Sequence, residues 1–522
     1  MLKDIGGYGI GVEISDKTRF WVHRNPLIWV LPLQAFLLFW KLDLLDPWVD
    51  EWGTRWFVTE PVRQVVSTVA GDFHPPLYFV LLHYWLQVPW PMTLVASMRA
   101  MSAAWALTGT VILYYLWLRR ERPQFQAMFL LLWTLSPCLL LHARMARSYS
   151  MELALALLTV YTALRCVEEP DNWKRLLAYV GSSTALLYTG YLSGFAIAGG
   201  AFVTFLVQRQ FALALAQIAL LGVLYIPWVP TFFSTLRQWH WFVTRSYVGG
   251  NVISDQMVRL AYWLVSFSFG ETFLTIGVLL SIVLSPFLIE AIWRGVKARP
   301  PWLALVLTAT GIGWIVVSRH EPFALMPNIL LFLLPFFLLL IVRKMKPAVF
   351  VALLVLYAIA DYAYFTKSGF LVKSYTAPFE KMVDVILDNS RGQNAIVAVT
   401  QKYAPDSYLL LNRLDADVRG TYLDDEASTH KMLEEARNGS LKSSVIWLWR
   451  HTKDTSPGTF VTKLEQDLSV GREVRRYEFV PYSLPERWAR RLLWGSGQPE
   501  YYYRLSEFRP VRSHEGRPGT PN

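Results

Sequence analysis

Long apolar runs, separated by short polar segments, dominate the first 365 residues of the chain. Each run is close to the roughly 20 residues that an α-helix needs to cross the hydrocarbon core of a bilayer. The runs begin near Pro26, Arg99, Gln124, Ser148, Arg175, Gly194, Phe211, Thr272, Trp302, Phe323 and Pro347. This pattern predicts an all-α polytopic membrane domain over residues 26–365, with about eleven transmembrane helices.

Two further apolar segments, 74–90 and 258–270, are short, and we interpret them as juxtamembrane helices on the outer side rather than as spans. Counting either one alone as a span would separate the basic clusters, which otherwise all fall on one side of the membrane. These clusters lie at 119–122, 172–175, 209–210, 294–299 and 343–346. The positive-inside rule makes that side cytoplasmic, together with the N-terminal tail at 1–25. The outer side then holds a first loop, 45–97, and a second loop, 231–271, long enough to form a lid.

The character of the chain changes after residue 365, where charge density rises and the apolar runs shorten. Residues 366–508 are predicted to form a soluble α/β domain on the outer face, followed by a flexible polar tail at 509–522. Turn signals and apolar runs predict strands at 394–401, 443–450, 472–482 and 501–508, and helices at 405–414 and 427–439.

The composition agrees with a membrane protein and excludes an ordinary soluble one. Only 17% of residues are charged and 54% are hydrophobic, whereas soluble domains carry about 25% charged residues. We interpret the net charge of +11 as a topology signal and expect no nucleic-acid partner. Cys138 and Cys166 both fall in apolar runs, so no disulfide framework is expected. The expected location is the inner (plasma) membrane, with the C-terminal domain periplasmic or extracellular.

Basic residues in the predicted outer loops need an explanation, because they oppose the topology rule. The short outer loops contain several arginines and no lysine. A guanidinium group binds a phosphate through two parallel hydrogen bonds, and an ammonium group does not. Arg144, Arg147 and Arg319 lie in very short loops near helix ends, so they are the candidate ligands of a phosphate, with His320 beside Arg319. The alternative is that single arginines extend from helix ends to the interface.

Two adjacent acids, Asp50 and Glu51, follow the first apolar run directly. On a helix or a strand they would point in different directions, so they are expected to have different roles. A partly desolvated carboxylate at the bilayer edge is a stronger base, which suits Asp50 for proton abstraction from a hydroxyl group. The alternative is that the acids cap an interfacial helix or pair with Arg55 one turn further on. His74 precedes Pro75 and Pro76 in the same loop, at a rigid corner where it could donate to a phosphate, orient the acid or simply cap a turn.

Three features together resemble the GT-C membrane glycosyltransferases. They are the Asp-Glu pair after the first span, the "HPPLYF" stretch at 74–79, and "LSPCLLLHARMARSYSMELALALL" at 135–158. The pattern is most similar to the branch of the protein O-mannosyltransferases and the lipid A aminoarabinose transferases. The resemblance implies a GT-C fold and inverting transfer of a sugar from a polyprenyl-phosphate carrier at the outer face. It also implies that the catalytic acid is Asp50, with Glu51 as its neighbour and His74 as the histidine of the motif.

Other positions follow from the resemblance less directly. The lysine that follows the His-Pro-Pro-Leu stretch in protein mannosyltransferases is replaced by Tyr78, which we assign to the cavity lining with Tyr149 and Glu321. Some family members use a second acid to hold a metal, and Glu271 and Glu321 are candidates only by their side and depth. A divalent metal therefore stays open.

The acceptor also stays open. A cell-envelope glycan or glycolipid is favoured, because the mannosyltransferase lysine is missing, and a protein acceptor is the first alternative. A lipid-linked sugar transporter would need charged residues at mid-bilayer depth and internal repeats, and the sequence displays neither. A non-catalytic scaffold would not need outer loops that contain arginine but no lysine.

Overall fold

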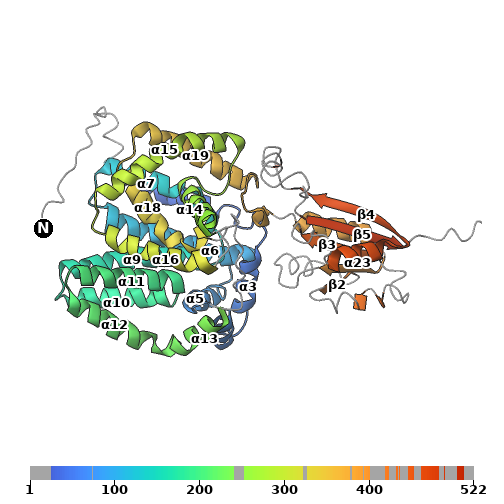
Figure 1. Ribbon diagram of the computed structural model, residues 1–522, viewed down its shortest axis with the longest axis horizontal. Helices are drawn as coiled ribbons and strands as arrows, with labels where there is room; N and C mark the ends of the chain where they lie inside the picture. The colour runs from blue at the N-terminus through green and yellow to red at the C-terminus, as the bar shows by residue number, and fades with distance from the viewer. Residues whose placement is uncertain are drawn as a thin grey trace, which may run out of the picture. The chain divides into compact units, whose positions relative to one another are not determined.

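The computed structural model describes residues 25–72, 74–239, 252–320, 326–376, 379–391, 393–399, 418–422, 431–432, 434–435, 445–451, 460–480, 487 and 503–510 (Figure 1). The chain divides into two compact units. The first comprises Met1–Asp43 and Thr54–Ser368, and the second comprises Leu44–Gly53 and Gly369–Asn522. The predicted first loop therefore does not belong to a single unit, because the division falls inside helix α3 (Val49–Val58).

Helices build the first unit, and each of the eleven predicted apolar runs contains at least one helix. The first half contains α2 (Leu27–Phe39), α4 (Val62–Gly71), α5 (Leu77–Trp85), α6 (Leu94–Ile112), α7 (Pro123–Thr134), α8 (Pro137–Ala143) and α9 (Tyr149–Glu168). The second half contains α10 (Trp173–Leu187), α11 (Tyr191–Val207), α12 (Phe211–Tyr225), α13 (Val229–Trp239), α14 (Val252–Phe269), α15 (Thr275–Lys297), α16 (Leu303–His320), α17 (Met326–Ile329), α18 (Leu334–Val342) and α19 (Pro347–Phe365).

Five of the described helices are long and apolar enough to cross a membrane. They are α6 with its π-helical continuation to Leu118, α9, α12 with its continuation to Arg237, α15 and α19. The pair α7 and α8, which meet at a bend of 51°, would make a sixth. Helices α2, α11, α16 and the segment Leu331–Val342 are apolar but shorter. The chain is thus a polytopic helical membrane protein, and the count of eleven crossings stays a prediction.

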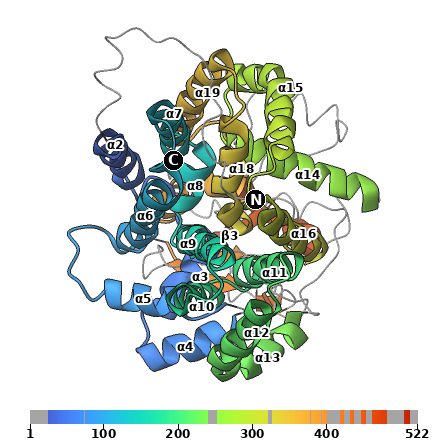
Figure 2. The ribbon, with the colours of Figure 1, turned by 90° about the vertical axis from the view of Figure 1, so that its left-hand side faces the viewer.

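Helix α9 lies in the middle of this unit, among α6, α10 and α11 (Figure 2). Its sequence is apolar on nearly all sides, and most of its side chains are buried. Of the five described helices of spanning length, α9 has the largest buried share, 72%, so it forms the centre of the bundle. The N-terminal end of α9 therefore holds the short loop that precedes it, residues 144–148, in a defined position.

A close helix contact gives the first testable prediction. Helices α11 and α16 pack at Gly200, where an added Cβ atom would lie 2.5 Å from the backbone oxygen of Leu305. Gly200→Ala should therefore push the helices apart and lower the free energy of unfolding by about 1–3 kcal/mol. Thermal unfolding in detergent micelles measures this effect. Gly222→Ala is the matched control, because a Cβ atom there meets nothing within 4 Å; equal melting temperatures for both variants would contradict the close contact.

The second unit contains a five-stranded sheet with the order β2 (Val418–Tyr422), β1 (Ala395–Val399), β3 (Val445–His451), β5 (Tyr503–Pro510) and β4 (Arg472–Phe479). Strand β1 pairs in parallel with β2 and β3, whereas β5 pairs antiparallel with β3 and β4. Helices α20 (Phe379–Ser390) and α23 (Phe460–Ser469) belong to the same unit.

Four of these strands confirm the predicted ones, and β5 extends two residues into the segment assigned to the flexible tail. Strand β2 and helices α20 and α23 were not predicted. The predicted helix at 405–414 lies outside the described residues, as does most of 427–439. The same holds for residues 1–24, 240–251 and 511–522, so the tail at 1–25, the middle of the 231–271 loop and most of the 509–522 tail are not tested.

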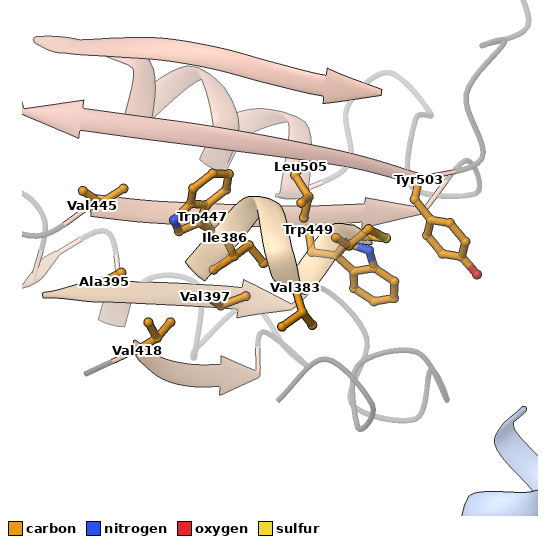
Figure 3. Packing of buried hydrophobic residues seen from close by; sticks show 11 residues of the cluster. Val383, Ile386, Ala395, Val397, Val418, Val445, Trp447, Trp449, Tyr503 and Leu505 are labelled. Carbon is orange, nitrogen blue, oxygen red and sulfur yellow. The ribbon is translucent and has the colours of Figure 1, made fainter. Parts of the chain in front are cut away.

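Alternating side chains give the sheet two apolar faces, as period-two strands require. Val397, Trp447, Trp449 and Leu505 lie on one face with Ile386 of α20, as Figure 3 shows. The other face carries a separate cluster of Ala398, Ile446, Leu448 and Phe508, which packs with Leu464 and Leu468 of α23. Burial of β-branched and aromatic residues on both faces explains why this part of the chain forms a compact α/β domain.

Candidate functional site

Helix α3 carries both acids of the first loop in its first turn. The Glu51 side chain is fully buried, and its Oε2 accepts a hydrogen bond of 3.3 Å from the backbone N–H of Trp48. A carboxylate at the third helical position that reaches back to the residue before the helix is half of a capping box. Glu51 therefore stabilises the start of α3, as the capping alternative foresaw. Asp50 is only partly buried, so the two adjacent acids do lie in different environments.

The His-Pro-Pro corner connects α4 to α5. Pro75 and Pro76 are buried, and α5 begins at Leu77, directly after the second proline. The backbone N–H of Leu77 donates to the carbonyl oxygen of Tyr188 at 2.9 Å, which ties the corner to the end of α10. Proline before a helix start has the backbone conformation that the first turn needs. His74 is thus held at a fixed place, with 31% of its side chain exposed.

Arg147 joins this corner to the loop between α8 and α9. Its guanidinium Nη2 lies 2.8 Å from Nε2 of His74, and its Nη1 donates to Oγ1 of Thr54 at 3.4 Å. Because arginine can only donate, His74 must accept through Nε2, so its imidazole is neutral and carries its proton on Nδ1. Phe79 packs against both groups, with its ring centroid 5.6 Å from the His74 ring and 5.9 Å from Cζ of Arg147. Arg147 is 6% exposed.

The ionisation of His74 follows from these neighbours. Enclosure by the protein, and then the positive charge of Arg147, lower the pKa of His74 well below its usual value. The carboxylate of Asp72, whose Oδ2 lies 3.8 Å from Nε2, does not reverse this effect. The neutral form that accepts from Arg147 is therefore present above the lowered pKa and is lost only as the pH falls through it.

A pH prediction follows for any activity of this site. A plot of wild-type kcat/KM against pH should show no step from His74 near pH 6.5, the ordinary pKa of a histidine. The comparison with His74→Gln, which keeps an acceptor oxygen, checks the assignment over the range from pH 5.5 to 8. A step near pH 6.5 in the wild type that disappears in His74→Gln would contradict the neutral histidine.

Tyr78 supports the same loop through a chain of hydrogen bonds. Its side chain is fully buried, and its hydroxyl shares a hydrogen bond of 2.8 Å with Oγ of Ser102. Ser102 in turn donates to the backbone oxygen of Arg147 at 3.0 Å. The residue that stands in the place of the mannosyltransferase lysine is thus part of a hydrogen-bond chain that positions Arg147. Its assignment to a cavity lining stays a prediction.

Arg144 is the first residue of the loop between α8 and α9, and it bonds to the C-terminal end of α2. Its guanidinium donates to the backbone oxygens of Leu37 at 2.6 Å and Lys41 at 2.5 Å, at the C-terminal end of α2. Lys41 has a positive φ of 50°, so the carbonyl groups that α2 leaves unpaired turn toward Arg144. The group also lies 5.1 Å from the ring centroids of both Tyr364 and Phe365. Arg144 is 2% exposed and stabilises the junction of α2 and α19.

Glu152 is a buried acid that the sequence analysis did not single out. Its Oε1 accepts a hydrogen bond of 2.6 Å from Ser148. The residue opposite is Gly190, where a Cβ atom would lie 2.4 Å from the carboxyl group of Glu152. An acid in the first turn of an otherwise apolar helix was the available signal, because ionisable residues are rare in membrane helices and mark functional sites.

A second polar cluster surrounds Glu271. Its Oε1 lies 2.9 Å from Nε2 of His142 and accepts from Ser266 at 3.0 Å, while its Oε2 accepts from Tyr262 at 2.7 Å. Both Glu271 and His142 are buried.

Tyr149 is the first residue of α9, and its hydroxyl accepts a hydrogen bond of 3.0 Å from Asn328. This candidate cavity residue is therefore bonded to α17.

The structure describes less of three other predicted site residues, Arg319, His320 and Glu321. Arg319 and His320 end α16, and their side chains lie outside the described residues, as does Glu321 entirely. Within the described part of the chain, no three residues among His, Cys, Asp and Glu converge so that they could hold a metal ion. The phosphate assignment of Arg319 and His320, the cavity assignment of Glu321 and the question of a metal all stay as the sequence left them.

No protein-family model matches the chain, and no curated protein matches it. Solved structures do. The apo crystal structure of ArnT from Cupriavidus metallidurans has a TM-score of 0.51 at 12% identity, over 94% of this chain and 98% of that chain. The structure of ArnT bound to undecaprenyl phosphate has a TM-score of 0.49 at 14% identity, over 92% and 97%. ArnT is a lipid A aminoarabinose transferase of the GT-C class. This chain therefore has the GT-C fold of ArnT over nearly its whole length.

Proposed function

We propose that this protein is an integral-membrane glycosyltransferase that moves a sugar from a polyprenyl-phosphate carrier to an acceptor on the extracytoplasmic side. The ArnT-like fold and the motif pair of the first loop support this class of reaction. The favoured acceptor is a cell-envelope glycan or glycolipid, because Tyr78 stands in the place of the protein-mannosyltransferase lysine. The enzyme would be a multi-pass protein of the inner membrane with a cytoplasmic N-terminus.

The contact between Arg147 and His74 carries the proposal. It joins two motifs that are 73 residues apart in the sequence, and both belong to the family resemblance. Neutral His74 accepts a hydrogen bond without contributing a negative charge, so this contact orients the guanidinium and does not neutralise it. An oriented arginine with low exposure is the residue type that suits the phosphate of a lipid carrier, since electrostatic attraction is stronger where water is excluded.

The proposed reaction is a single displacement with inversion. The carboxylate of Asp50 takes the proton of the acceptor hydroxyl, and the hydroxyl oxygen attacks the anomeric carbon of the sugar. The bond between that carbon and the phosphate oxygen breaks, and the electron pair leaves with the polyprenyl phosphate. Arg147 stabilises the negative charge that develops on this leaving group, so its contribution is larger in the transition state than in the bound substrate.

Neighbouring residues have supporting roles under this proposal. Glu51 holds the helix start beside Asp50, and the chain from Tyr78 through Ser102 holds the backbone of Arg147. Arg144 fixes the end of α2, so its loss should affect stability more than catalysis. Arg319 and His320 remain candidates for a second contact with the carrier phosphate.

The direct test uses the purified full-length protein in lipid nanodiscs with polyprenyl-phosphate-linked sugars as donors. Release of polyprenyl phosphate together with a glycosylated acceptor supports the proposal. Mass analysis of glycolipids, glycans and glycoproteins from cells with and without the gene then identifies the acceptor class. Glycosylated protein as the only changed product would favour the protein O-glycosyltransferase alternative. Movement of intact lipid-linked sugar across the bilayer, without transfer, would overturn the proposal in favour of a transporter.

A further inference from the structure

The segment that carries Asp50 belongs to the same compact unit as the C-terminal α/β domain. Residues Leu44–Gly53 form one compact unit with Gly369–Asn522, although more than 300 residues separate the two segments in the sequence. The acid pair therefore lies in the same compact unit as a domain for which the sequence indicated no chemistry.

Two tryptophans make this packing. Trp48, which is buried, meets the buried Tyr375 edge to face, with 5.5 Å between ring centroids and an interplanar angle of 80°. Trp52 packs against the apolar cluster that α20 forms with one face of the sheet. Edge-to-face aromatic pairs and large buried rings are among the most effective contacts for holding a segment in one position.

Asp50 lies between these two contacts in the chain. Trp48 precedes α3 by one residue, and its backbone N–H is bonded to the buried Glu51; Trp52 follows Asp50 by two residues on the same helix. The backbone at Asp50 is thus restrained on both sides by side chains that the C-terminal domain holds. A base must be placed accurately, because a misplacement of about 1 Å can lower a rate about 100-fold.

We propose that the C-terminal α/β domain positions the catalytic base, and that Trp48 and Trp52 are the positioning residues through which it acts. This inference rests on the proposed function, since it concerns the geometry of the same acid. The domain is then a part of the catalytic apparatus rather than only a docking module for the acceptor.

The test compares Trp52→Ala with Trp52→Phe and with a matched control on the same helix. Trp52→Ala should lower kcat about 10- to 100-fold and leave KM for the polyprenyl-phosphate donor within about twofold, because the base moves while the carrier contacts remain. Trp52→Phe should restore most of the rate, because it keeps an aromatic ring in the apolar cluster. Trp56→Ala, at a position that is 65% exposed, should behave as the wild type. Unchanged kcat in Trp52→Ala would overturn the inference.

A second measurement depends neither on activity nor on the stability of the Trp52→Ala variant. In a Trp48→Cys, Tyr375→Cys double variant, the loss of both large rings opens the site to a short bismaleimide, which should join the two positions; the two single variants measure the background from the buried Cys138 and Cys166. Failure to cross-link in the folded protein would overturn the proposed contact. The two proposals can fail separately. Full activity in Asp50→Asn removes the proposed base, whereas an inactive Asp50→Asn with a fully active Trp52→Ala removes only the positioning role.

Discussion

Asp50→Asn is expected to lower kcat by about 10²- to 10⁴-fold, because an amide cannot take a proton from the acceptor hydroxyl. The change keeps the size and shape of the side chain, so folding and affinity for the carrier should persist. Single-turnover kinetics with a polyprenyl-phosphate-linked sugar measure the chemical step apart from product release. Binding of the donor, followed by fluorescence or calorimetry, then shows whether the loss concerns chemistry alone.

Glu60→Gln is the matched control for this experiment. Glu60 follows α3 in the same loop and undergoes the same exchange of carboxylate for amide. Its kcat should stay close to the wild-type value. Transfer at the wild-type rate by Asp50→Asn membranes would remove the proposed mechanism, and an equal loss in Glu60→Gln would point to a general electrostatic effect of the loop instead of a base at Asp50.

Arg147→Ala is expected to have the second-largest effect, a loss of about 10²- to 10³-fold in kcat/KM, as for the removal of one well-placed donor to a developing charge. Arg147→Lys should fall between Ala and the wild type, because lysine keeps the charge and loses the planar fork that bonds His74 and Thr54. Steady-state kinetics and the affinity for free polyprenyl phosphate measure the two contributions separately.

Two other arginines make this prediction specific. Arg63→Ala, on the exposed surface of α4, should leave both kinetics and carrier affinity unchanged. Arg144→Ala should lower the melting temperature, because it removes the groups that bond the end of α2, and should affect carrier affinity less than Arg147→Ala. The assignment of the phosphate to Arg147 is wrong if carrier affinity survives in Arg147→Ala and is lost in Arg144→Ala.

Several parts of the fold could be predicted because their signals are local. The apolar runs that contain α6, α9, α15 and α19 are long enough to indicate membrane helices by themselves. Strands β1 and β3 could be found because short runs of β-branched and aromatic residues lie between turn signals. Strand β2, which contains Arg419 and Gly420, lacks that signal and depends on pairing with β1 for its conformation.

The candidate site was predictable as a set of residue types and not as a set of contacts. The sequence predicted a position near the outer membrane face for Asp50, Glu51, His74, Arg144 and Arg147, because position relative to apolar runs is a local property. It could not separate Arg144 from Arg147, which are three residues apart. Their partners come from α2, α19 and the His-Pro-Pro corner, and the choice between them depends on how the helices pack.

The sequence by itself determined that this is a polytopic helical membrane protein with a C-terminal α/β domain, and it predicted outer loops that carry the acids and the arginines. Hydrophobicity and its period are properties of neighbouring residues, so they can be recognised without knowledge of the fold. Only the tertiary structure decided that Glu51 is a buried cap, that His74 is the neutral partner of Arg147, and that Trp48 and Trp52 pack with the C-terminal domain. Burial and hydrogen-bond partners depend on segments that are tens to hundreds of residues away. The free energy of those contacts therefore cannot be inferred from the pattern of neighbouring residues.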